Sequence, residues 1–119
     1  METGYPEATV SLIALLDGSA SLYFENGGGI IGGGDHESVG RAATAMATEA
    51  DGLIQYCSKS DTFPLPDKGG TTFYILTTDG IYTFSAREQD LGEDRQSLSP
   101  LFHAGHEVIG QLRMTVDRR

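Results

Sequence analysis

The chain has 119 residues, and its 17 Asp and Glu outnumber its 8 Lys and Arg, which gives a formal net charge of −9. A chain of this length is typical of a single domain, here residues 1–119, and we expect residues 1–7 and 115–119 to fray. Acidic proteins are repelled by phosphate backbones and anionic lipids. The charge therefore argues against nucleic acid and membrane partners.

The apolar runs and the cysteine content indicate a cytoplasmic protein. The longest uninterrupted apolar run covers residues 12–16, far fewer than the ~20 that a helix needs to span a bilayer. The acidic N-terminus lacks the basic segment that begins a secretory signal peptide. Cys57 is the single cysteine and has no partner for an internal disulfide, as is common in a reducing compartment.

An Asp-Gly pair at residues 17–18 predicts a β-hairpin. Asp-Gly supplies the positive φ angles of a two-residue type I′ turn, and residues 9–16 and 19–25 on either side favour strands. With Asp17-Gly18 as the whole turn, Ile13 pairs with Leu22. Residues that pair across strands share a face, so this register predicts one apolar face made of Ile13, Leu15, Leu22 and Phe24.

A second Asp-Gly pair, at residues 79–80, predicts a second hairpin. With Asp79-Gly80 as the turn, Ile75 pairs with Phe84, and one face again carries four apolar side chains, Phe73, Ile75, Tyr82 and Phe84. The opposite face carries Tyr74, Leu76 and Ile81, which is more apolar than a solvated sheet face requires. This set predicts an interaction face; a second layer of the same domain is the alternative explanation.

Two stretches have the spacing of amphipathic helices. Apolar residues recur every three or four positions in the first stretch, at Val39, Ala43, Met46, Ala50, Leu53 and Cys57. Ser99 followed by Pro100 is typical of a helix start, and apolar residues continue at helical spacing from Leu101 to Leu112. We therefore expect an α+β domain of ββα-ββα order. Its antiparallel sheet would have four to five strands, the fifth around Phe63, with the two helices packed on one face.

A glycine-rich stretch, Gly27–Gly34, lies between the first hairpin and the first helix. The glycines that satisfy the G-x-G-x-x-G spacing of nucleotide-binding loops are Gly27, Gly29 and Gly32. However, Asp35 and Glu37 follow, and their carboxylates would oppose a phosphate at the helix N-terminus. The competing interpretation is a tightly bent connection that places Ile30-Ile31 in the core.

Two histidines on the second predicted helix form a candidate ligand site. His103 and His106 lie one turn apart, a usable spacing for metal ligands, and His36 would add a third. Their surroundings match neither zinc-protease pattern, H-E-x-x-H or H-x-x-E-H. The ligand hypothesis combines these histidines with Gly29 and Gly32 of the glycine-rich stretch. Histidines at the boundary of an amphipathic helix are the simpler interpretation, and we predict no catalytic residue, no cofactor and no metal.

The hairpins and helices cover most of the chain, as Ser11–Phe24, Val39–Cys57, Phe73–Ala86 and Leu101–Leu112. In this order, with an Asp-Gly turn in each hairpin, the chain resembles the roadblock (dynein light chain) and longin-like domains. The resemblance implies one antiparallel sheet and homodimers or heterodimers. It also implies a role as a scaffold or as a regulator of small GTPases, without catalytic residues.

Three functional hypotheses follow. The leading one is a non-enzymatic, cytoplasmic interaction module, a homodimer of roadblock-like type that uses a sheet edge, a helix or the Tyr74, Leu76 and Ile81 face. The second is a small-ligand or metal-binding domain that uses the Gly27–Gly34 stretch with His103 and His106. The third is an acidic inhibitor of a basic protein, since residues 1–40 hold six acidic residues and no Lys or Arg.

Overall fold

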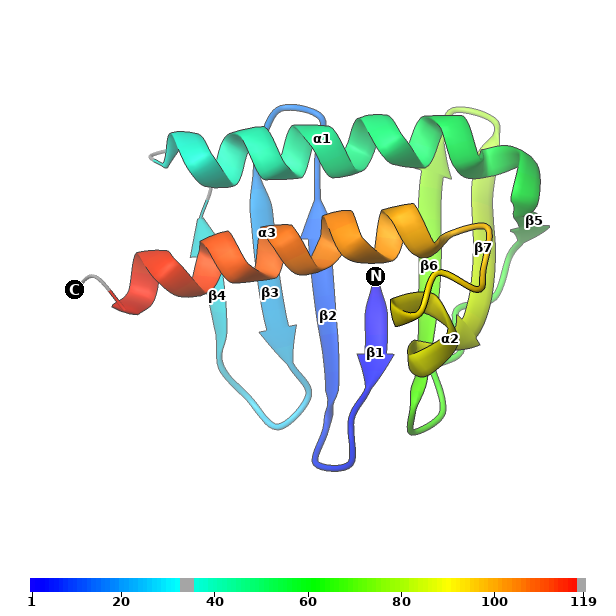
Figure 1. Cartoon of the computed structure of the whole chain (residues 1–119), viewed down its shortest axis with the longest axis horizontal. Helices are drawn as coiled ribbons and strands as arrows, with labels where there is room; N and C mark the ends of the chain where they lie inside the picture. The colour runs from blue at the N-terminus through cyan, green and yellow to red at the C-terminus, as the bar shows by residue number, and fades with distance from the viewer. Residues whose placement is uncertain (33–35, 118–119) are drawn as a thin grey trace.

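The protein folds as one antiparallel sheet of seven strands with helices on one of its faces (Figure 1). The computed structural model describes residues 1–32 and 36–117. Along the chain the elements are β1 (Glu2–Gly4), β2 (Thr9–Ala14), β3 (Ala20–Phe24), β4 (Gly29–Gly32), α1 (Glu37–Leu53), the 3₁₀ helix η1 (Ile54–Tyr56), β5 (Ser58–Ser60), β6 (Gly70–Thr77), β7 (Gly80–Arg87), α2 (Glu88–Gly92) and α3 (Ser99–Asp117). The strand order in the sheet is β4-β3-β2-β1-β6-β7-β5.

The α+β class and the antiparallel sheet are confirmed, but the sheet has seven strands where four to five were expected, and the ββα-ββα order is not confirmed. Four strands precede α1, and three strands and the short helix α2 lie between α1 and α3. The additional strands have three or four residues, too few to show an alternation of apolar and polar side chains. Segment Arg87–Gln96, whose charges indicate a loop, instead contains α2, which buries Leu91.

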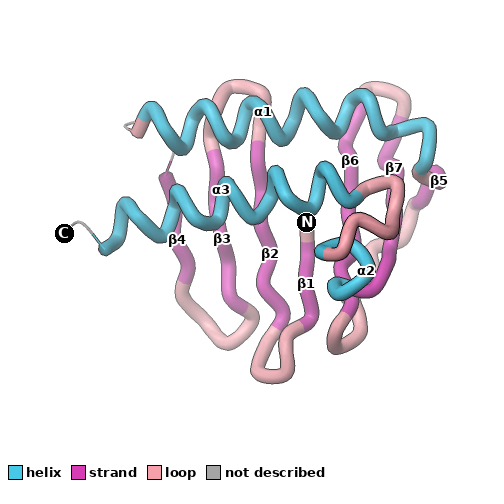
Figure 2. The backbone as a smooth tube through the Cα atoms, in the orientation of Figure 1, coloured by secondary structure: helices cyan, strands magenta, loops and turns pink. Residues whose placement is uncertain are grey.

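The first strand lies in the middle of the sheet, so the expectation that residues 1–7 fray is wrong for Glu2–Gly4. β1 pairs with β2 on one side and with β6 on the other. Figure 2 shows this short strand between two groups of longer strands. At the other end of the chain, α3 continues through Asp117, whereas residues 118–119 lie outside the described part.

The first hairpin has a register one residue away from the predicted one. Leu12 pairs with Leu22, and Ala14 pairs with Ala20. The turn is one residue longer than expected: the Leu15 N–H donates to the Ser19 carbonyl (3.0 Å), and Gly18 takes a positive φ of 90°. A shift of one residue turns every side chain of a strand over, so Leu12 faces the core and Ile13 faces away from it.

The second hairpin is shifted by two residues, which leaves the faces as predicted. Phe73 pairs with Phe84 and Ile75 with Tyr82, because the two-residue turn is Thr78-Asp79 and Gly80 already belongs to β7. The Thr77 hydroxyl accepts from the Asp79 N–H (3.1 Å) and donates to the Gly80 carbonyl (2.9 Å), which closes this turn. An even shift preserves the alternation, so the predicted apolar face is confirmed.

The core lies between the sheet and the two long helices. α1 buries Val39, Ala43 and Met46, three residues of the predicted apolar stripe. α3 begins at Ser99, as the Ser-Pro signal predicts, and buries residues along its whole length, namely Leu101, Phe102, Val108 and Leu112. The sheet contributes Leu12, Leu22 and Phe73 to the same cluster.

Candidate functional site: the open face of the sheet

The face of the sheet opposite α1 and α3, here called the open face, carries large apolar side chains. Its residues alternate along each strand with the buried ones: Leu12 is 3% exposed, whereas its neighbour Ile13 is 48% exposed. Antiparallel sheets normally present polar side chains on a solvated face. On this sheet, Ile31 and Leu76 are 78% and 74% exposed.

The strand register places these side chains together in an apolar band, defined as Ile13, Ile31, Tyr74, Leu76 and Ile81. Ile13 and Ile31 both pair with Ser21, from either side, and Leu76 pairs with Ile81. Ser11 and Thr72 both pair with Glu2 of β1. Ile13 lies two residues after Ser11, and Tyr74 lies two residues after Thr72. The two side chains are therefore at the same level across the sheet, just beyond the first residue of β1.

A polar row crosses the sheet next to the apolar band. The Ser11 hydroxyl donates to the Glu2 carboxylate (2.8 Å), and the hydroxyls of Thr72 and Ser85 lie 2.9 Å apart. Within the strands, register assigns two charged side chains to the open face, Glu2 and Arg87. The strands therefore contribute one charge of each sign to the open face of a strongly acidic protein.

The segment that follows β5 covers one member of the band. The Tyr74 hydroxyl donates to the Pro64 carbonyl (2.8 Å), and the Phe63 ring lies 5.3 Å from the Tyr74 ring at an angle of 56°. Partial burial, with a smaller effect of the Glu2 charge, raises the pKa of Tyr74, so its hydroxyl remains a donor. The structure thus brings Tyr74, Leu76 and Ile81 together, with Tyr74 beneath a short piece of the same domain.

Two members of the band were not predicted from the sequence. The predicted first-hairpin register directs Ile13 to the core, and the bent-connection interpretation places Ile31 there. Along β4, the exposed Ile31 follows the partly buried Ile30. Since side chains alternate between the two faces of a strand, a predicted strand at Gly29–Gly32 would have placed Ile31 on the open face.

The glycine-rich stretch does not form a nucleotide-binding loop in its described part. Gly27 takes a positive φ of 106° in the turn after β3, and Gly29 and Gly32 belong to β4 at the edge of the sheet. The described part of the stretch is therefore a turn followed by the edge strand β4. Gly33, Gly34 and Asp35 lie outside the described residues.

The three histidines occupy separate environments. His36 is the N-cap residue of α1 and is exposed, and the Nε2 atom of His103 lies 2.7 Å from Asp94 Oδ1. His106 packs its ring against Phe102, with ring centroids 4.5 Å apart, and burial lowers its pKa. Within residues 1–32 and 36–117, no group of three or more His, Cys, Asp or Glu side chains is arranged to hold a metal ion.

None of the helices in the described ranges is long and apolar enough to cross a membrane.

The chain matches no protein-family model, no curated protein and no solved structure, so a function is inferred from the residues and geometry above.

Proposed function

We propose that this protein is a non-enzymatic interaction module of the cytoplasm that forms a homodimer through the apolar band of its open face. The observation that carries the proposal is the exposure of Ile31 and Leu76 on a sheet face that the long helices leave uncovered. Large apolar side chains exposed on one face of a sheet are typical of a protein–protein contact.

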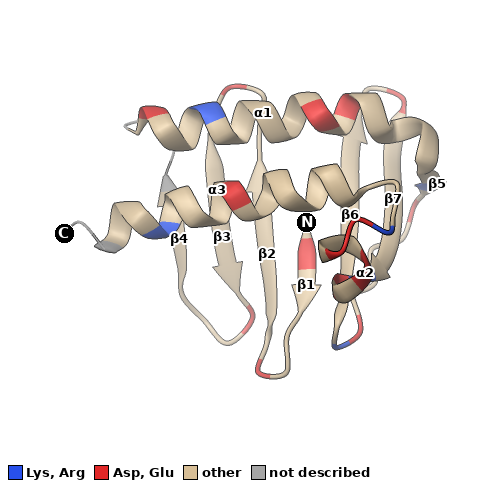
Figure 3. Ribbon diagram, viewed as in Figure 1, with Lys and Arg blue, Asp and Glu red and all other residues tan. Residues whose placement is uncertain are grey.

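The distribution of charge favours a second copy of the same chain as the partner. Figure 3 shows acidic residues, in red, along α1, α2 and the turns, and one red segment on the central strand β1, whose acidic residue is Glu2. Two copies that stack open face on open face keep most of their acidic groups apart. Sheets packed in this way lie about 10 Å apart, and a two-fold axis brings the same apolar band of both copies together.

The resemblance to roadblock and longin-like domains supports a dimer, since it implies homodimers or heterodimers that serve as scaffolds. It also extends the proposal to small GTPases as a class of regulated partner. This extension rests on the sequence resemblance alone and on no individual residue.

Self-association can be tested with two leucine variants of equal chemistry. Leu76 lies in the apolar band, whereas Leu16 is 71% exposed in the β2–β3 turn, where its carbonyl accepts from Thr44 of α1. We expect the wild-type protein and Leu16→Glu to sediment as dimers, and Leu76→Glu and Ile31→Glu as monomers, in analytical ultracentrifugation over a dilution series. A wild-type protein that stays monomeric at the highest concentration would refute the dimer.

The effect of salt separates this proposal from the acidic-inhibitor hypothesis. Contacts between exposed charges weaken as the Debye length falls, to ~3 Å at 1 M salt, whereas apolar burial is not screened. We expect the dimer to persist at high salt. Binding to a basic protein that disappears on addition of salt, without self-association, would favour the inhibitor.

A further inference from the structure

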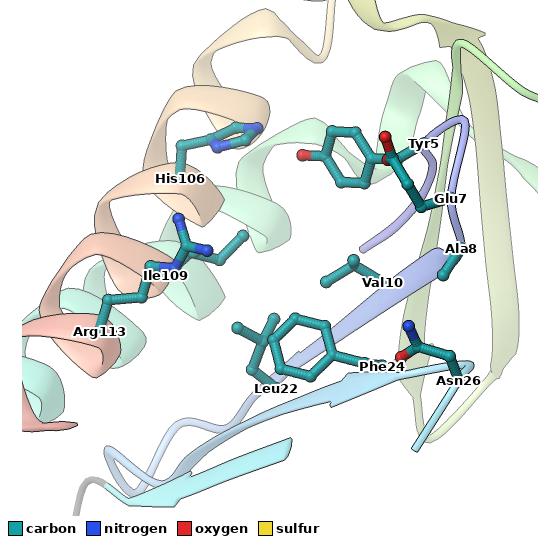
Figure 4. A pocket seen from close by; sticks show the side chains of 10 residues that line it. All are labelled: Tyr5, Glu7, Ala8, Val10, Leu22, Phe24, Asn26, His106, Ile109 and Arg113. Carbon is teal, nitrogen blue, oxygen red and sulfur yellow. The ribbon is translucent and has the colours of Figure 1, made fainter. Parts of the chain in front are cut away.

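A cleft lies between α3 and the end of the sheet that carries the β1–β2 and β3–β4 turns. Its volume is about 440 Å³, within the usual range for small-molecule sites. Four apolar side chains form its floor: Val10 from β2, Leu22 and Phe24 from β3, and Ile109 from α3 (Figure 4). It lies on the helix-covered side of the sheet, away from the apolar band, and is independent of the proposed dimer contact.

Polar groups line the rim above this apolar floor. Figure 4 shows His106 and Arg113 of α3 facing Tyr5 of the β1–β2 turn, with Asn26 near Phe24 at the other end of the cleft. The pKa of Tyr5 is raised, chiefly by burial, with Glu88 raising it and Arg113 lowering it. The Tyr5 hydroxyl therefore stays protonated and lies within the influence of the Arg113 charge.

One polar atom at the rim lacks a protein partner. Of the side-chain nitrogen and oxygen atoms that are buried among the described residues, His106 Nε2 and Glu88 Oε2 make no hydrogen bond. Burial holds His106 in its neutral form, and the adjacent Glu88 charge opposes this effect. A buried polar atom without a partner is unfavourable, so a ligand group that pairs with His106 Nε2 gains affinity from it.

The charges at the rim define what kind of head group would fit. Arg113 is exposed, and no described carboxylate lies within salt-bridge distance of its guanidinium. A guanidinium binds a carboxylate with two parallel hydrogen bonds. Glu7 also lines the cleft and Glu88 acts on its rim; both repel an anion, a doubly charged phosphate more strongly than a singly charged carboxylate.

We propose that this cleft binds a small amphipathic monocarboxylate, with the carboxylate on Arg113, within reach of the Tyr5 hydroxyl and His106, and the apolar body on Val10, Leu22, Phe24 and Ile109. The inference adds a ligand to an interaction module and does not depend on the dimer. It also moves the ligand hypothesis from Gly29 and Gly32 of β4 to the cleft between α3 and the sheet, while keeping His106.

The test uses three probes of one shape: 3-phenylpropionate, its amide 3-phenylpropanamide, and 3-phenylpropylamine. We expect 3-phenylpropionate to bind saturably and to shift the amide NMR signals of cleft residues such as Leu22 and Ile109. The neutral amide should bind less tightly and the amine least. Arg113→Gln should weaken binding of 3-phenylpropionate about tenfold, which corresponds to one lost charge-assisted contact.

Arg41→Gln is the matched control, because Arg41 is also an exposed arginine on a long helix but lies on α1 and outside the cleft. This variant should bind 3-phenylpropionate as the wild-type protein does. The proposal is overturned if 3-phenylpropionate gives no saturable shift, if the amine binds more tightly than the acid, or if both arginine variants lose the same affinity. The NMR spectrum of each variant shows directly that it is folded.

Discussion

The hydroxyls of Thr3 and Thr71 share a hydrogen bond of 3.0 Å, although 68 residues separate them in the chain. Both side chains are buried, at 3% and 0% exposure. Thr3 belongs to β1 and Thr71 to β6, so this bond joins the two strands at the centre of the sheet. It is a polar contact in a place where neither hydroxyl has ready access to water.

A double-mutant cycle on this pair should show strong coupling. Thr3→Val or Thr71→Val alone leaves one buried hydroxyl without its partner, and we expect a loss of about 1–3 kcal/mol in the free energy of unfolding. The double variant replaces both hydroxyls by methyl groups of the same shape, so its loss should be smaller than the sum of the two. Urea denaturation measures all four proteins; additive losses would contradict a shared hydrogen bond.

The amino group of Met1 should make stability depend on pH. It donates to the Leu12 carbonyl (2.9 Å), and burial lowers its pKa from 8.0 to about 6. Between these values the unfolded chain binds the proton more readily than the folded one. Stability should therefore fall as the pH falls from 8 towards 6, by about 2.7 kcal/mol at most over the full window.

Measurements between pH 8 and pH 6.5 separate this effect from that of His106. The pKa of His106 is lowered from 6.5, so its protonation changes stability mainly below pH 6.5. Nα-acetylation of Met1 is the control, since the acetylated amine cannot titrate. Thermal unfolding should show the slope in the free amine form alone. Equal stability of the unmodified 119-residue chain at pH 8 and pH 6.5 would contradict the lowered pKa.

Two glycine-to-alanine substitutions should act in opposite directions. Gly18 has a φ of 90°, and a Cβ there would lie 3.1 Å from the Cα of Gly40, so Gly18→Ala should destabilise the protein by about 1–2 kcal/mol or more. Gly52 lies in α1 with open space where a Cβ would stand, and Gly52→Ala should stabilise it by ~1 kcal/mol. Chemical denaturation of both variants gives the two signs directly.

Cys57 should react slowly with thiol reagents in the folded protein. Burial raises the pKa of its thiol, whose Sγ lies 3.6 Å from the Leu53 carbonyl. Because the thiolate is the reactive form, the rate with a disulfide reagent near neutral pH should rise when urea unfolds the chain. A rate that is the same in folded and unfolded protein would show that the thiol is fully accessible.

The hairpins show which parts of the fold were predictable from the sequence. Each Asp-Gly pair identified a turn correctly, but the first turn is one residue longer than predicted and the second begins one residue earlier. An error of two residues in the second hairpin left Phe73 in the core and Leu76 outside. An error of one residue in the first hairpin predicted Ile13 in the core, where the structure has Leu12. The side chains exposed on the open face therefore depend on a single residue in the loop.

The cleft was beyond sequence reasoning for a different reason. Its rim unites Tyr5, Asn26, His106 and Arg113, which come from both ends of the chain and meet only because β1 and β2 lie beneath α3. The regular spacing of α3 pointed to His103 and His106 as a pair. Both rings lie against Phe102, but His103 Nε2 also lies 2.7 Å from Asp94, and no third ligand completes a metal site among the described residues.

The central position of β1 has a consequence for the order of folding. β2, β3 and β4 are joined by short turns and can pair as soon as they are synthesised, and so can β6 and β7. β1 links these two groups of strands, and its partner β6 appears only after α1 and β5 have been made. Pairing β1 with β6 closes a long loop, and the loss of chain entropy comes before the contacts between the strands can form. The sheet should therefore assemble as two preformed halves, and β1, although it precedes every other strand described here, would be among the last to find both of its neighbours.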